Sequence, residues 1–377
     1  MKIKFGFFIS LILAVGLVAA PFSCQAPKEE GEEKAPSDSA WELLQELVLI
    51  PGVSTHEEEV VDFIQARLPS ETKVQRDEMD NLWFSVGKGS PHLVFVAHTD
   101  ETGLEVKEIT SQGTLKVKGR GGFFPQMYEG YPVVVYTKNG EVEGVMAPRS
   151  HYHQRNSSPP SFQWEDMEID LGVENEHKAR ALGVGVGDPV TIKKKIVHLQ
   201  SDLIATRAVD DRAGCAAILA AARRIDGDEI EGKKVTFLWD VQEEIGLYGA
   251  RHMAQKLDAD FVFPVDTFVS SDAPLDNKRF AYLPLGKGAV LRGIDSSNIA
   301  PQRWRQKVIE IAEAHHIPLQ RGNTRGGNDG SVFVPQGAVD IPLSWPGVYS
   351  HTFIEKIHRQ DLENLTRLIV ALAKDWE

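Results

Sequence analysis

The chain has 377 residues, 42% of them hydrophobic, so it is long enough for two domains and can bury a sizeable core. Its 41 Lys and Arg against 54 Asp and Glu give a net charge of -13, which argues against a nucleic acid partner because an acidic surface repels phosphates. The composition also excludes a chain that is disordered overall.

The N-terminal segment is predicted to direct export and not to belong to the fold. Two lysines precede an apolar run over residues 5–20 that is too short for a comfortable membrane span, so residues 1–23 are read as a signal peptide. Cys24 follows in a context that resembles a bacterial lipoprotein cleavage site. We therefore expect a periplasmic or cell-surface lipoprotein with a lipid anchor at Cys24; the alternative is a secreted protein. Residues 24–40 are polar and predict an acidic, solvated tether.

The folded part is predicted to begin with two helices and two strands. Apolar residues recur at intervals of three and four over residues 41–68, interrupted by the turn PGVSTHE, where Ser54 or Thr55 is expected to cap the second helix. The segments LWFSVG and LVFVA then read as strands. Residues 41–104 are therefore predicted as the first part of an α/β domain.

Residues 105–200 have a different pattern. Short alternating segments such as TLKVKGR, DPVTIKKKIVHL and YPVVVYTKNGEVEGVMA, with a hairpin turn at Asn139-Gly140, predict a small all-β unit. After it, helices and buried strands alternate again. Residues 201–377 are thus predicted to complete the α/β domain, with Cys215 as a small core residue. The expected fold class is α/β, a mostly parallel sheet flanked by helices with an inserted small β-barrel domain.

Metal-competent side chains stand at every predicted strand end of this α/β domain. In open α/β sheets, functional groups gather at the carboxyl ends of the strands. Imidazoles and carboxylates with no Cys among them suit a pair of divalent ions held by N and O ligands. The residues are His98, Asp100, Asp210, Asp211, Glu243, Glu244, Asp266 and His351.

Each of these residues also has an ordinary structural interpretation. A His after a strand is more often a satisfied surface residue than a ligand, and Asp210 or Asp211 alone would be a helix N-cap. Glu243-Glu244 alone would be a solvated turn. Only the set as a whole indicates a metal centre.

The motifs AHTDETG, AVDDRAG, VQEEIGLYGA, PVDTF and YSH occur in this order, within a resemblance to a known family that covers about residues 41–375. Together they resemble the co-catalytic di-zinc aminopeptidases of the glutamyl aminopeptidase and tetrahedral aminopeptidase type. The segment MEIDLGVENEHKARALGVGVGDPV in the insertion is similar to that family as well. The resemblance implies a metal-dependent aminopeptidase acting on peptide substrates.

The resemblance also implies roles for single residues. His98, Asp210 and Asp266 would hold one divalent ion, and Asp210, Glu244 and His351 the other, zinc in the first place with cobalt or manganese as alternatives. Glu243 would be the general base that takes a proton from water and returns it to the leaving amine. Asp100 would orient the ring of His98.

Several features remain outside this assignment. The family usually has Gly-Gly-Thr-Asp-Ala where this chain has Gly326-Gly327-Asn328-Asp329-Gly330, which leaves the shape of the substrate pocket open. Glu101 has no predicted role. Lys193–Lys195 are predicted as a solvated strand edge, and the His151/His153 pair as a loop or packing feature.

Two other functions are compatible with parts of this sequence. One is an endoglucanase-like glycosidase using Glu243 and Glu244, although adjacent residues are poorly placed to flank one bond. The other is a non-catalytic binding lipoprotein with the same fold, although no ligand or base is lost. The resemblance further implies a homo-oligomer, often a dodecamer. A tether of some fifteen residues extends only about 50 Å, so not all subunits of a large particle could reach one membrane.

Overall fold

The structure is a computed structural model and describes residues 39–149, 163–278 and 281–377. Several predicted features lie outside the described residues. They are the signal peptide, Cys24, the tether except for its end, and the His151/His153 pair. Within the described ranges, no helix is both long enough and apolar enough to cross a membrane.

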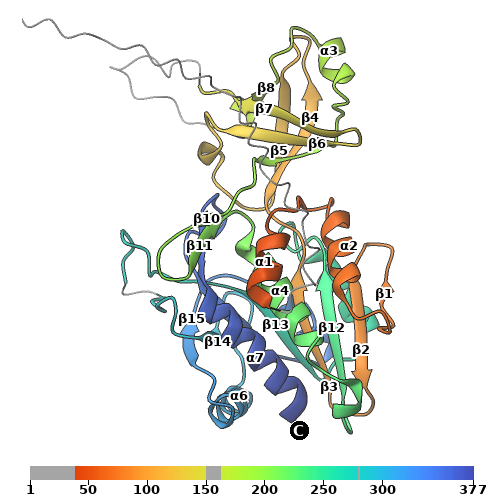
Figure 1. Cartoon of the computed structure of the whole chain (residues 1–377), viewed down its shortest axis with the longest axis vertical. Coiled ribbons are helices and arrows are strands. Elements are labelled where there is room, and N and C mark those ends of the chain that lie inside the picture. The colour runs from red at the N-terminus through yellow and green to blue at the C-terminus, as the bar shows by residue number, and fades with distance from the viewer. Residues whose placement is uncertain (1–38, 150–162, 279–280) are drawn as a thin grey trace, which may run out of the picture. The chain divides into compact units, whose positions relative to one another are not determined.

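A mixed nine-stranded sheet forms the centre of the α/β part, in the order β1-β2-β12-β3-β13-β17-β14-β15, with β16 beside β13 (Figure 1). Neighbouring strands are parallel at β12/β3, β3/β13, β13/β17 and β14/β15, and antiparallel at β2/β12 and β14/β17. The strands are β1 (Gln75–Arg76), β2 (Leu82–Gly87), β3 (His92–His98), β12 (Lys234–Asp240), β13 (Phe261–Val269), β14 (Ala289–Ile294), β15 (Leu319–Asn323), β16 (Val339–Asp340) and β17 (Leu343–Gly347).

Helices cover both faces of this sheet. One face packs against α1, α4, α6 and α7 around a large apolar core, and the other packs against α5 and the short 3-10 helix over residues 329–332. The helices are α1 (Ala40–Leu47), α2 (Glu58–Arg67), α4 (Val209–Ala222), α5 (Tyr248–Lys256), α6 (Gln302–Ala314) and α7 (Arg359–Asp375). Cys215 is fully buried in the larger core, as predicted.

The sequence of strand β3 explains its central position in the sheet. Its side chains alternate between the two cores, with Leu93 and Phe95 in one and Val94 and Val96 in the other. A strand buried on both faces needs the continuous apolar run that the sequence provides, and only its last residue, His98, is polar at the carboxyl end.

The inserted strands close into a barrel in the order β4-β5-β8-β7-β6-β9. They are β4 (Gly103–Ile109), β5 (Leu115–Arg120), β6 (Pro132–Thr137), β7 (Gly140–Met146), β8 (Glu168–Asp170) and β9 (Pro189–Ile192), with the short helix α3 (Glu176–Ala181) between the last two. Together with the central sheet, this barrel confirms the predicted fold class.

One local prediction is wrong. Neither Ser54 nor Thr55 caps α2, because Glu57 occupies the N-cap position and the Ser54 hydroxyl donates to Asp100 Oδ2 instead, at 2.6 Å. The segment 188–199 contains two strands, which belong to different sheets. After β9 the chain leaves the barrel and forms β10 (Val197–His198) in a separate sheet with β11 (Leu203–Thr206) and β18 (Glu355–His358).

Candidate metal centre

The predicted site residues come together at one edge of the central sheet. His98 ends β3, Asp266 lies in β13, and the turn after β12 carries Glu243-Glu244. Because β3, β12 and β13 are parallel neighbours, their carboxyl ends meet. Asp210 comes from the start of α4 and His351 from the loop between β17 and β18.

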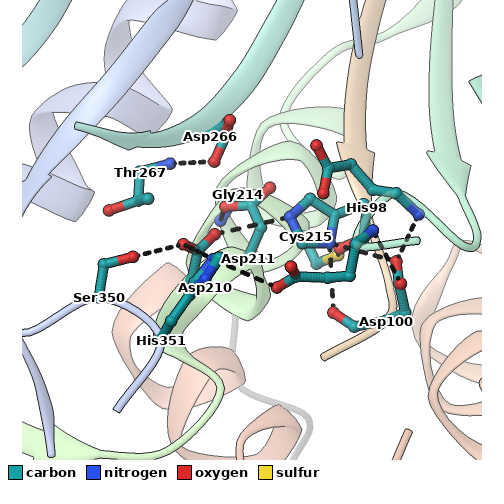
Figure 2. Close-up of polar contacts among 12 residues, drawn as sticks. His98, Asp100, Asp210, Asp211, Gly214, Cys215, Asp266, Thr267, Ser350 and His351 are labelled. Atoms are coloured by element: carbon teal, nitrogen blue, oxygen red, sulfur yellow. Dashed lines mark hydrogen bonds and ion pairs between the residues drawn. The ribbon is translucent and has the colours of Figure 1, made fainter. Parts of the chain in front are cut away.

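Asp210 lies between the two histidines (Figure 2). Its Oδ1 is 3.5 Å from His98 Nε2, and its Oδ2 is 3.7 Å from His351 Nε2. The two carboxylate oxygens therefore face different imidazoles. This is the arrangement that a carboxylate shared by two cations requires.

Two groups of ligand atoms surround this carboxylate. One oxygen or nitrogen atom each of His98, Asp210 and Asp266 lie within 4.8 Å of one another, and so do atoms of His98, Glu243 and Glu244. On the other side of Asp210, His351 Nε2 is 3.6 Å from Glu244 Oε1. Every residue predicted as a metal ligand is thus within reach of Asp210 or His98.

Asp100 connects the end of β3 to the turn that carries the two glutamates. Its Oδ1 is 3.3 Å from His98 Nδ1 and accepts the backbone N–H of Glu243 at 2.9 Å. Its Oδ2 accepts the backbone N–H of Glu244 at 3.2 Å and the Ser54 hydroxyl. One buried carboxylate therefore fixes both the His98 ring and the Glu243-Glu244 backbone.

Burial and mutual repulsion shift the pKa values of these groups. Burial, with repulsion from Asp329 and Glu244, holds the pKa of Glu243 well above its usual value despite His98. Burial and the carboxylate of Asp210 raise the pKa of Glu244 to about 7. Burial alone would lower the pKa of His98, but its contacts with Asp100 and Asp210 hold it well above the usual value. The carboxylates of this site thus carry more negative charge than the neighbouring imidazolium groups can compensate.

Unpartnered oxygen atoms support the same conclusion. Among the described residues, Asp211 Oδ2, Asp329 Oδ1 and both carboxylate oxygens of Asp240 are buried without a hydrogen-bond partner. Burial raises the pKa of Asp240 to about 8. Buried carboxylates of this kind need protons or cations, and a donor set of N and O atoms fits divalent ions such as zinc, cobalt or manganese.

Sequence reasoning missed several residues that hold this centre in place. Glu355 accepts the backbone N–H groups of Asp210 at 3.0 Å and His351 at 2.7 Å, and the Ser350 hydroxyl donates to Asp210 Oδ2 at 3.0 Å. Glu57 accepts the backbone N–H of Gln242 at 3.1 Å. No pattern marked these residues, because Glu355 lies on a short strand and Glu57 at a helix start, where acids are common.

A second missed residue supports Asp266. Arg292 on β14 is 1% exposed, and its Nη2 is 3.1 Å from Asp266 Oδ2. The other Asp266 oxygen accepts the backbone N–H of Thr267 at 2.5 Å. Burial raises the pKa of Asp266 although Arg292 opposes the shift. Arg292 therefore orients this carboxylate and compensates part of its charge.

The cluster opens into a pocket of about 370 Å³ that holds both cluster residues and apolar ones. Phe123 and Phe124, from the barrel loop after β5, line this pocket together with Thr267 and Val269 of β13. The lining residues are His98, Gly122, Phe123, Phe124, Asp210, Glu243, Asp266, Thr267, Val269, Arg292, Gly326, Gly327, Ser350, His351 and Thr352. A small organic group thus fits next to the candidate metal ligands.

Glu101, which had no predicted role, is the anion of a buried ionic cluster behind the site. Its side chain is 1% exposed; Oε1 is 2.6 Å from Lys194 Nζ and 3.8 Å from Arg212 Nη2, and Oε2 is 2.8 Å from Arg207 Nε. The prediction of a solvated edge is therefore wrong for Lys194, whose side chain is 4% exposed, whereas the neighbouring Lys193 is 66% exposed. The cluster joins the end of β3 to the segments before and after β11.

The segment that departs from Gly-Gly-Thr-Asp-Ala has a packing explanation. A Cβ at Gly330 would lie 2.4 Å from Asp340 Oδ1 and 2.8 Å from Pro264 Cγ. Burial and repulsion by Asp295 hold the pKa of Asp340 well above its usual value. The glycine at position 330 thus leaves room for the buried side chain of Asp340.

We expect Gly330→Ala to destabilise the protein by about 1–3 kcal/mol, because the added methyl group has no room beside Asp340. Chemical denaturation would measure the loss. Gly326→Ala is the matched control, since no atom lies within 4 Å of its Cβ position, and should stay within about 0.5 kcal/mol of the parent. Adding Asp340→Ala to Gly330→Ala should recover part of the loss; equal effects of the two glycine variants would contradict this explanation.

A second group of potential metal ligands differs from the candidate metal centre. It consists of Asp77, Glu78 and His252. Lys256 Nζ lies 3.0 Å from Asp77 Oδ2 and 3.6 Å from Glu78 Oε2. The lysine ammonium already compensates these carboxylates and occupies the space between them. This group is therefore a partly exposed ionic cluster between α5 and the β1–β2 turn.

Comparison with known protein families gives a specific match. The model of the M42 glutamyl aminopeptidase family matches residues 81–368. This range includes the barrel and every candidate metal ligand described above.

Individual proteins agree with that match. The lysyl aminopeptidase of Pyrococcus furiosus is 29% identical over 348 residues, covering 89% of this chain and 97% of the relative. The TET1 peptidase of Pyrococcus horikoshii, which can assemble into a tetrahedron or a large octahedral shell, has a TM-score of 0.83 at 34% identity, covering 89% and 100% of the chains. An aminopeptidase of Desulfurococcus kamchatkensis has the same TM-score at 27% identity, covering 89% and 94%.

Proposed function

The chain belongs to the M42 glutamyl aminopeptidase family and is a metal-dependent aminopeptidase. From this premise we propose that it uses two bound zinc ions to remove N-terminal residues from peptides. The observation that carries the proposal is the position of Asp210, whose two oxygens face His98 and His351. A single metal ion would not need a carboxylate that faces two imidazoles.

The proposed ligand sets follow from these contacts. His98, Asp210 and Asp266 would hold one ion, and their ligand atoms lie within 4.8 Å of one another. Asp210, Glu244 and His351 would hold the other, supported by the distance of 3.6 Å from His351 Nε2 to Glu244 Oε1. Cobalt or manganese could replace zinc, because all of these ligands are N or O donors.

Bound divalent ions supply Lewis acidity for the peptide carbonyl and lower the pKa of water. Glu243 lines the pocket and is not needed as a ligand in either proposed set, so its carboxylate is the group that can accept a proton and later return it to the leaving amine. Asp100 accepts the backbone N–H of Glu243, which holds this glutamate in place, and also orients the His98 ring. The pocket walls would then exclude water from the side chain of the N-terminal residue.

Metal removal tests this proposal directly. We expect dialysis against a chelator to abolish hydrolysis of aminoacyl substrates, because the peptide carbonyl then loses its Lewis acid. Zinc, cobalt or manganese should restore the activity, and elemental analysis of the restored enzyme should give two ions per chain. Full activity of metal-free protein, or a stoichiometry of one ion in the fully active enzyme, would contradict the two-ion site.

Neither of the alternative functions accounts for the site as well. Glycosidase carboxyls stand on opposite sides of one bond, about 5–10 Å apart. Glu243 and Glu244 are adjacent, and the backbone N–H groups of both donate to Asp100. The glycosidase hypothesis also leaves His98 and His351 without a function. A non-catalytic binding protein would not need an unligated glutamate at the metal centre.

We also propose a homo-oligomer, supported by the assemblies known for the structurally similar TET1 peptidase. Light scattering on the mature protein would measure it. Export as a lipoprotein anchored through Cys24 remains a proposal from the sequence, with plain secretion as the alternative. Mass spectrometry of the N-terminal peptide from cells would distinguish a lipidated Cys24 from an unmodified one.

A further inference from the structure

A second polar pocket lies between α6, β14 and the edge strand β15. Its volume is about 520 Å³, and Leu291 and Gly293 of β14 line it. Because side chains of a strand alternate between faces, Leu291 points away from the face on which its neighbour Arg292 contacts Asp266. Figure 1 shows α6, β14 and β15 in the same region of the fold. This pocket is therefore separate from the candidate metal centre.

Two arginines in this pocket, Arg305 of α6 and Arg321 of β15, have no partner among the described residues. No hydrogen bond, ion pair or ring contact joins either guanidinium to a described residue, and Arg305 Nε is buried without a hydrogen-bond partner. The remaining arginines in the described ranges all have such a contact; Arg303, for example, stacks on Trp304. In a chain with a net charge of -13, carboxylate partners are abundant elsewhere.

The rest of the lining suits an anion. It contains three amide side chains and no Asp or Glu. One acid outside the lining, Glu310, accepts a hydrogen bond from the Gln306 amide at 3.2 Å. Gly293 leaves the floor open, because a Cβ there would lie 2.8 Å from Arg305 Nη1 and 2.8 Å from Asn323 Oδ1. The lining residues are Leu291, Gly293, Gln302, Arg305, Gln306, Ile309, Arg321, Gly322 and Asn323.

We propose that this pocket binds the oxyanion group of a small ligand, a phosphate or a carboxylate, through Arg305 and Arg321. Guanidinium groups bind both anions through paired, charge-assisted hydrogen bonds. The amides of Gln302 and Gln306 can donate to further oxygens of the same ligand. The pocket is larger than a phosphate ion, so the oxyanion would belong to a small organic molecule.

Calorimetry on the full-length, metal-loaded protein tests the proposal, with inorganic phosphate and acetate as separate probes at matched ionic strength. We expect saturable binding of at least one probe, weakened about tenfold by Arg305→Met or Arg321→Met and lost in the double variant. Arg303→Met is the matched control on the same helix and should change the affinity less than twofold. Which probe binds more tightly distinguishes a phosphate ligand from a carboxylate. Peptidase activity should stay unchanged in all of these variants.

Three outcomes would overturn the proposal. One is the absence of saturable binding of either probe to the parent protein. A second is binding that persists in the double variant and disappears on metal removal, because the anion then binds at the metal centre. A third is a change of oligomeric state in the double variant without any binding by the parent, because the arginines then pair with a second copy of the chain. Each outcome leaves the proposed peptidase function untouched.

Discussion

Glu243→Gln is expected to reduce kcat for aminoacyl substrates by about 10²- to 10⁴-fold, because an amide cannot accept the proton that the carboxylate takes from water. The substitution preserves the shape of the side chain and the backbone N–H that donates to Asp100. Glu243 is not required as a ligand in either proposed set, so the variant should still bind two ions. Steady-state kinetics and elemental analysis of the same preparation would measure both quantities.

The control for this variant is Glu174→Gln, since Glu174 is a glutamate with a side chain that is 78% exposed, and should leave kcat unchanged. Retention of activity in Glu243→Gln with both ions bound would show that another group transfers the proton. A loss of metal together with activity would show instead that Glu243 is a ligand. The experiment therefore separates the two roles open to the adjacent glutamates.

Glu101→Gln is expected to destabilise the protein by about 3–5 kcal/mol, because it leaves Lys194, Arg207 and Arg212 buried without their anion. Burial alone would raise the pKa of Glu101, but these three cations lower it to about 2, so the carboxylate is charged at neutral pH. Chemical denaturation would measure the loss of stability. Activity should fall as well, because Glu101 follows Asp100 directly.

Lysine variants provide the matched comparison. Lys194→Met should cost less than Glu101→Gln, because Arg207 still compensates the carboxylate. Lys193→Met should change stability by less than about 0.5 kcal/mol, because that side chain and its partner Glu143 are 66% and 69% exposed. Combining Glu101→Gln with Lys194→Met should recover part of the loss. Equal effects of the two lysine variants would contradict the buried cluster.

The fold class and the set of candidate ligands could be predicted from the sequence for a physical reason. Strand β3 is buried on both faces, so its apolar run is unambiguous, and the first polar residue after it, His98, stands at the carboxyl end. The same argument applies to the turn after β12. The family resemblance is confirmed by the match over residues 81–368, whereas the roles of single residues stay predictions.

The parts that could not be predicted depend on contacts between distant segments. Lys194 lies in a run of three lysines, and such a run normally indicates solvent; burial of its middle member depends on Glu101, which is 93 residues earlier. Serine is a common helix-capping residue, but the hydroxyl of Ser54 donates its hydrogen bond to Asp100 and not to the start of α2. Local pattern cannot show which of two partners a polar side chain will choose.

The barrel loop after β5 constrains how the insertion can evolve. His351 Nδ1 is 2.5 Å from the carbonyl oxygen of Gly122, and because a carbonyl only accepts, the ring donates through Nδ1 and directs Nε2 toward Asp210 and Glu244. A backbone atom of the insertion thus orients one proposed ligand. A chimaera with a foreign barrel is therefore expected to keep the orientation of His351 only if it preserves this carbonyl.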